Sequence, residues 1–145
     1  MDIENKRFLI VGGGGTAARK LGTLRKFDAA VTVIAQKTAI QEEDGVRVLQ
    51  KTFEETDLTG MDYVIAATGS DETDAKIAAL CKAQGIPVNT TGDAEQGDFY
   101  LPATIKEGPL IVAVSTSGTS PAFARKMRQE IEKELPPDIG EILER

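Results

Sequence analysis

The sequence contains no histidine and only one cysteine, Cys81. Histidine is the commonest metal ligand and general base in proteins, so we expect no metal site and leave proton chemistry to carboxylates, water and the backbone. A single cysteine excludes an internal disulfide. Because Cys81 lies in an apolar stretch, we predict that it is a small buried core residue and not a reactive thiol.

Long hydrophobic runs are also missing. No stretch reaches the roughly 18 apolar residues that a membrane span needs, and charged residues lead directly into the first apolar run, which is not typical of a signal peptide. We therefore expect a cytoplasmic protein without membrane contact. The net charge of −6 argues against a nucleic-acid partner. The 145 residues are enough for one compact domain with a small appendage.

The most informative pattern is the apolar run Phe8-Leu9-Ile10-Val11, which ends in glycines. Their spacing is G-x-G-x-x-A, and a helical pattern over residues 16–26 follows at once through Ala18, Leu21 and Leu24. A dinucleotide pyrophosphate needs this order, because the glycines allow a tight turn and close backbone approach, and the helix N-terminus offers N–H groups to the anion. The predicted cofactor-binding residues of this loop are Gly12, Gly14, Gly15, Thr16 and Ala17.

Strands and helices alternate along the next 70 or so residues. This alternation predicts an α/β fold, a Rossmann-type parallel sheet that forms an NAD-binding domain over residues 1–101, with ligands at the carboxyl ends of the strands. Ser70 or Asp71 is expected to cap the second helix, and Gly85 to end it. We predict strands at 31–35, 46–49, 62–67 and 86–89, a short helical turn at 38–43 and a helix at 72–84.

The strand ends supply further candidate cofactor-binding residues. An NAD site usually places an acid after the second strand, but here Gln36 and Lys37 stand there. Gln36 can bond the ribose through its amide, and Lys37 can tolerate a 2′-phosphate or be a solvated loop lysine, so NAD and NADP both stay open. Beyond the next strands, the predicted cofactor-binding residues are Thr68, Gly69 and Asn89.

The pattern changes after residue 101. Two strands at 102–106 and 109–115, joined by a turn, are followed by a hydroxyl-rich loop and a helix from Pro121 to about 135, with Ser120 as its N-cap. The loop, the helix N-terminus and nearby basic residues suit an anion, although a well-capped surface helix with solvated cations fits the same residues. The candidate substrate-binding residues are Ser115, Thr116, Ser117, Ser120 and Arg125.

Several motifs together resemble the precorrin-2 dehydrogenase module of siroheme synthases. They are Val11-Gly12-Gly13-Gly14 with Ala17-x-Arg19-Lys20, then Val31-Thr32-Val33, Thr68, Val88-Asn89, Phe99-x-x-Pro102-Ala103 and Gly118-x-Ser120-Pro121-x-x-Ala124-Arg125. The resemblance implies NAD-dependent oxidation of precorrin-2 to sirohydrochlorin, in some members also insertion of ferrous iron. It further implies a homodimer in which residues 102–145 serve dimerisation and contact the polycarboxylate tetrapyrrole.

The sequence departs from this family in two places. Members usually continue into a further helical domain, so we expect a short form that lacks it or a missing piece. The family's essential aspartate falls three residues after the asparagine of the Val-Asn motif, where this chain has Gly92, with Asp93 one step late. Asp93 is the predicted catalytic carboxylate, acting as a general base, or else only the N-cap of a turn at 94–97. The alternatives are a non-catalytic NAD- or tetrapyrrole-binding regulatory protein, or a chelatase alone.

Overall fold

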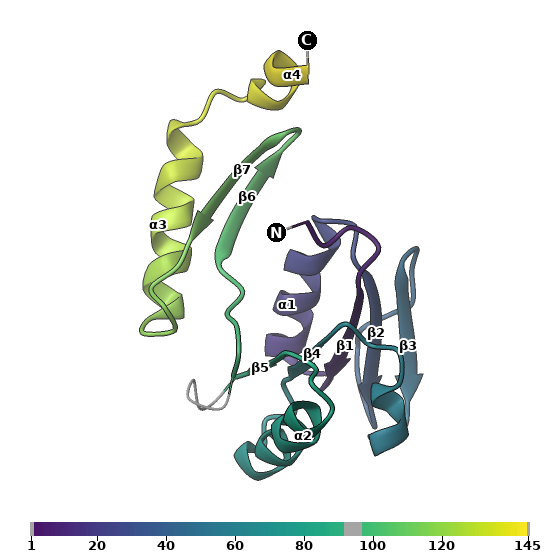
Figure 1. The fold of residues 1–145 in the computed structure, drawn as a ribbon. Coiled ribbons are helices and arrows are strands. Elements are labelled where there is room, and N and C mark those ends of the chain that lie inside the picture. The colour runs from purple at the N-terminus through teal and green to yellow at the C-terminus, as the bar shows by residue number, and fades with distance from the viewer. Residues whose placement is uncertain (1, 92–96, 145) are drawn as a thin grey trace. The chain divides into compact units, whose positions relative to one another are not determined.

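The computed structural model describes residues 2–91 and 97–144 and divides into two compact units, Met1–Phe99 and Tyr100–Arg145. The first unit holds a five-stranded parallel sheet in the order β3-β2-β1-β4-β5, coloured from purple to teal in Figure 1. This order confirms the predicted α/β class. The elements are β1 (Arg7–Val11), α1 (Gly15–Arg25), β2 (Ala30–Ala35), β3 (Val46–Gln50), the 3-10 helix η1 (Glu55–Leu58), β4 (Tyr63–Ala66), α2 (Asp71–Ala83) and β5 (Val88–Thr90).

The strand order reverses direction between β1 and β4. From β1 the chain crosses through α1 to β2 on one side, and from β4 it crosses through α2 to β5 on the other. The two helices cover opposite faces, since Val88 packs in a core cluster with Ile77 and Cys81 of α2, whereas the next residue, Asn89, bonds Lys20 of α1. Such a reversal leaves a crevice at the carboxyl ends of the central strands, where ligands of doubly wound sheets bind.

Two predicted elements of this unit differ from the structure. Residues 38–43 form no helical turn, because the Thr38 hydroxyl donates to Gly13 O and accepts from Ile40 N, and Glu43 forms a bridge with Val46. The fifth strand begins at Val88 and not at residue 86. There the Ile86 amide donates to Cys81 O and so closes the end of α2 before the strand starts.

The second unit is an antiparallel hairpin with two helices. Its strands β6 (Ala103–Glu107) and β7 (Leu110–Val114) pair directly across a turn in which Gly108 has φ of 58°, and α3 (Pro121–Glu134) packs on both. A short helix, α4 (Ile139–Glu144), follows, and its Gly140 lies against the turn at Gly108. Within the described residues, no helix has the length and apolar character to span a bilayer.

Cys81 lies in the core and is fully buried, as predicted. Burial raises the pKa of its thiol to about 11, and the nearby Asp98 carboxylate adds to the rise. Because only the thiolate reacts, about one thiol in a thousand is reactive at pH 8. We expect iodoacetamide at pH 8 to label native Cys81 at least about 100-fold more slowly than the urea-unfolded chain, as measured by mass spectrometry. Equal rates in the two states would contradict this burial.

Candidate functional site

The N-terminus of α1 faces open space at the carboxyl edge of the sheet. Gly14 and Gly15 are exposed, and a Cβ built on either would meet no atom within 4 Å. The N-cap, Gly14, provides no side-chain cap, and no acidic residue lies in the first turn. The N–H groups and positive end of this helix are therefore available to an anion. The Thr16 hydroxyl at the same end accepts a bond from Arg19 at 3.2 Å, which adds a cation.

The turn before the helix is tightly packed. Gly12 has φ of 135°, and a Cβ there would lie 1.9 Å from Ala67 O. Ala17 is fully buried, so the helix approaches the sheet closely. Gly12 and Ala17 thus pack the loop against the sheet, whereas Gly14 and Gly15 lie on its exposed side.

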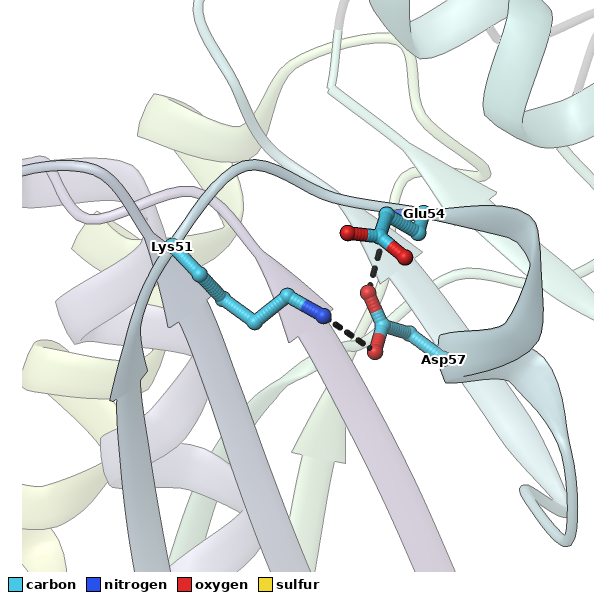
Figure 2. A network of polar contacts seen from close by, with 3 residues as sticks. All are labelled: Lys51, Glu54 and Asp57. Carbon is cyan, nitrogen blue, oxygen red and sulfur yellow. Dashed lines mark hydrogen bonds and ion pairs between the residues drawn. The ribbon is translucent and has the colours of Figure 1, made fainter.

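The carboxyl end of β2 carries the residues predicted at the ribose, and β3 ends beside it. Gln36 is exposed and donates from Nε2 to Thr52 Oγ1 at 2.9 Å, and Lys37 is exposed as well. A second lysine, Lys51, forms an ion pair with Asp57 at 2.8 Å. The Asp57 carboxylate, by its hydrogen bond, raises the pKa of Lys51. Figure 2 shows this contact together with the bond from the Glu54 backbone to Asp57.

The Lys51 ion pair matters for the choice between NAD and NADP, because a free lysine here could bind a 2′-phosphate. Asp57 is itself held at 2.8 Å by the Glu54 amide as part of a capping box on η1. The charge of Lys51 is therefore matched by a fixed carboxylate. Lys37, among the described residues that follow β2 and β3, forms no ion pair. NAD and NADP are both compatible with this edge.

Thr68, predicted to bind the cofactor, is joined to a buried acid. Asp74 in the first turn of α2 is 3% exposed. Its carboxylate accepts from Thr68 N at 3.0 Å, from Thr68 Oγ1 at 2.6 Å and from Thr91 Oγ1 at 3.3 Å. The helix N-terminus favours this negative charge, and Ser70 caps the same helix by accepting from Thr73 N. The exposed Gly69, with φ of 82°, completes the turn above it.

Asn89 points into the protein and not toward the open edge. Its side chain is 3% exposed; Oδ1 accepts from Lys20 Nζ, and Nδ2 donates to Phe99 O at 2.8 Å. Contact between this amide and a nucleotide stays a prediction. Lys20 was not among the predicted site residues, although its spacing from Ala17 and Leu21 placed it on the buried face of α1. The predicted apolar position Ala18 is exposed.

Lys20 is an unusual cation for the inner face of a helix. Desolvation by burial lowers its pKa to about 8, against an opposing attraction from Asp74 and with a small repulsion from Arg19. The predicted catalytic residue Asp93 lies outside the described residues. The residues on either side of that stretch are joined, since Val88 N donates to Asp98 Oδ2 at 3.0 Å and Asp98 N donates to Val88 O at 2.7 Å.

In the second unit, the predicted substrate-binding hydroxyls form the loop before α3. Ser115, Thr116 and Ser120 each accept a backbone N–H, from Ser117, Ser120 and Phe123 respectively. These bonds use lone pairs and leave each hydroxyl hydrogen to donate. Ser117 has φ of 56°, uncommon for a residue with a side chain. Arg125 in the first turns of α3 is exposed, whereas Arg128 pairs with Glu132 at 2.8 Å.

Comparison with known proteins gives two family matches along the chain. Residues 1–103 match the family described as "Putative NAD(P)-binding", and residues 107–134 match the "Sirohaem biosynthesis protein central" family. The siroheme synthase of Methylococcus capsulatus is 42% identical over 92% of this chain and 29% of its own length. That of Thioalkalivibrio sulfidiphilus is 36% identical over 98% of this chain and 30% of its own length.

A solved structure, "SirC, precorrin-2 dehydrogenase", is similar with a TM-score of 0.79 and 25% identity, and the match covers 99% of this chain and 73% of that one. The chain spans about 30% of the length of the curated relatives it matches.

Proposed function

Because this chain belongs to the NAD(P)-binding family matched above and is similar to siroheme synthases over nearly its whole length, we propose that it binds NAD and oxidises precorrin-2 to sirohydrochlorin. A cytoplasmic location accompanies the proposal, since the one cysteine is a buried free thiol. Ferrochelation is a further activity that some members of the resembled family possess.

The observation that carries the proposal is the open N-terminus of α1. The N-caps of α2 and α3 are serines, and each side chain accepts a backbone N–H of the first turn. The N-cap of α1 is Gly14, so no side chain occupies the N–H groups of its first turn, which also contains no acid. A Cβ on Gly14 or Gly15 would enter open space that a pyrophosphate can fill. The residues present therefore fit a dinucleotide.

The chain's own contribution to the reaction is binding and proton handling. When bound, NAD supplies the hydride acceptor. The oxidation removes a hydride and a proton from precorrin-2, so a base or water must take the proton, and we assign this role to Asp93. Ser115, Thr116, Ser117, Ser120 and Arg125 are proposed to bind substrate carboxylates through hydroxyl donors, backbone N–H groups and a guanidinium.

An anaerobic assay tests the proposal. Purified protein mixed with precorrin-2 and NAD is expected to produce NADH absorbance at the rate at which sirohydrochlorin appears, and an NADP arm measures cofactor preference. Absence of turnover with both nucleotides would overturn the enzyme proposal. Tight NAD binding by calorimetry in that case would identify a non-catalytic binding protein. An arm with sirohydrochlorin, ferrous iron and no NAD measures chelation separately.

We also propose a homodimer formed through the second unit. Large apolar side chains lie exposed on β7, α3 and α4 of this unit, namely Ile111 (53%), Phe123 (56%), Met127 (38%), Ile142 (45%) and Leu143 (49%). Several large exposed apolar side chains on so small a unit are typical of a protein that buries them in an interface. Light scattering at micromolar concentration is expected to give twice the chain mass of 15.5 kDa. The double change Phe123→Glu with Met127→Glu should shift the protein to monomer, and a clean monomer mass for the unchanged protein would contradict the proposal.

A further inference from the structure

Lys20 is a half-buried cation that the proposed reaction does not yet use. It lies on the same helical face as Ala17, Leu21 and Leu24, all of which are buried. A lysine on such a face must lose much of its hydration, which is costly unless polar groups receive it. Here the receiving group is the Oδ1 atom of Asn89, the middle residue of β5.

The Asn89 side chain links Lys20 to the segment that follows β5, because it also bonds Phe99. With Oδ1 bound by Lys20, the amide has a fixed orientation, and its Nδ2 donates to Phe99 O at 2.8 Å. Two adjacent bonds join Val88 to Asp98, one through the backbone and one through the Asp98 carboxylate. Residues 88–89 and 98–99 are thus joined by three hydrogen bonds, and we call these four residues the clamp.

From these contacts we propose that Lys20 is a positioning residue, which orients Asn89 and thereby holds the four residues of the clamp together. The proposal rests on the proposed function in one respect, because the clamp encloses the sequence segment that carries Asp93, the predicted base. The contacts of Lys20, Asn89 and Phe99 themselves do not depend on that function.

The clamp is expected to respond to pH. The charged groups that act on Lys20 are Asp74 of α2, which favours the ammonium, and Arg19 of α1, which opposes it. With its pKa lowered to about 8, Lys20 is charged below that pH and becomes neutral as pH rises through it. A hydrogen bond from a charged donor is stronger than one from a neutral amine. The clamp should therefore be firm at pH 7 and weaker at pH 9.

Amide hydrogen exchange measured by NMR, without NAD or tetrapyrrole, tests this directly. After correction for the intrinsic exchange rate, the protection of the Val88 and Asp98 amides should fall about 10-fold between pH 7 and pH 9. The Gly12 amide serves as the internal reference, because it donates to Ile34 O at 2.9 Å and takes no part in the clamp. Its protection should not change with pH. Constant protection of Val88 and Asp98 across this range would overturn the proposal.

The variant Lys20→Met keeps the aliphatic stem and removes the charge. Its Val88 and Asp98 protection at pH 7 should match that of the unchanged protein at pH 9, with no further pH response. Lys76→Met is the matched control, because Lys76 is an exposed helical lysine with 74% of its side chain accessible. If Lys20→Met fails to fold, the pH series on the unchanged protein still decides the outcome.

Turnover adds a readout that a purely structural lysine would not move. In the NAD-dependent assay, Lys20→Met should lower kcat about 10-fold while the NAD dissociation constant stays within about twofold. We expect kcat of the unchanged protein to fall between pH 7 and pH 9 as Lys20 loses its charge. This fall should be absent in the variant. If the unchanged protein shows no turnover, the proposed function fails while the exchange experiment still reports on Lys20. Unchanged kcat with lost protection would limit Lys20 to a structural role and overturn the positioning role.

Discussion

Replacing Gly14 by valine is expected to abolish NAD binding and leave the fold intact. The N-cap backbone at Gly14 has φ of −91°, which any residue adopts, and a Cβ there meets no atom within 4 Å. The added side chain would fill the space that the pyrophosphate needs against the N–H groups of α1. We expect the dissociation constant for NAD to rise at least about 100-fold, which corresponds to about 2.7 kcal/mol.

Calorimetry with NAD and circular dichroism with thermal melting measure the two halves of this prediction. The matched control is Gly12→Ala, which stands two residues earlier in the same motif. There φ is 135° and the Cβ would overlap Ala67 O at 1.9 Å, so this variant should lose about 3 kcal/mol of stability or more. Gly14→Val with a normal melting curve and undiminished NAD affinity would place the nucleotide elsewhere and contradict the proposed site.

The first unit could be predicted from sequence because its signals are local. The apolar residues of strands such as 8–11 and 31–34 are buried, and Ser70 and Ser120 cap their helices as predicted. A serine before a helical pattern acts on amides two or three residues away, so its effect does not depend on the rest of the fold. The parallel pairing of β1 with β2 and of β4 with β5 follows from the crossover helices α1 and α2 between them.

The parts that sequence missed depend on distant partners. The direction of Asn89 is set by Lys20 and Phe99, which lie 69 and 10 residues away. Nothing near Asn89 in the sequence shows that its amide is bonded on both sides. Residues 38–43 look like a helical turn by composition, but the Thr38 hydroxyl bonds the Gly13 carbonyl, 25 residues earlier, and this stretch forms no helical turn. Tertiary contacts decide both cases.

The burial of Asp74 could not be predicted from the sequence either. In sequence it is one of several acids at the start of a helix, where carboxylates are common. In the structure it alone among the first-turn acids of α2 is buried, and it receives three donors from Thr68 and Thr91. It therefore ties together the ends of β4 and β5, and its carboxylate is committed to protein groups.

Replacing Asp93 by alanine is expected to lower the rate of precorrin-2 oxidation by about 100- to 10,000-fold, the range for loss of a general base. Gly92 occupies the family's aspartate position and can neither accept a proton nor bind a metal. The chain has no histidine to take over, and the Asp74 and Asp98 carboxylates bond protein groups. Asp93 directly follows Gly92 in the sequence, and we therefore propose that it receives the proton.

The competing explanation is that Asp93 only caps a turn, and Asp93→Ser separates the two roles. Serine keeps a cap oxygen and removes the carboxylate, so a capping role predicts near-normal turnover for serine and a stability loss of about 1 kcal/mol for alanine. A base predicts that serine and alanine lose turnover equally while both melt near the unchanged protein. The assay uses saturating NAD, and calorimetry verifies that both variants still bind it, so that a lost rate reports on the proton transfer. Near-normal turnover of Asp93→Ser would leave the proton to water, and the chain would then oxidise its substrate by holding it in place without a side-chain base.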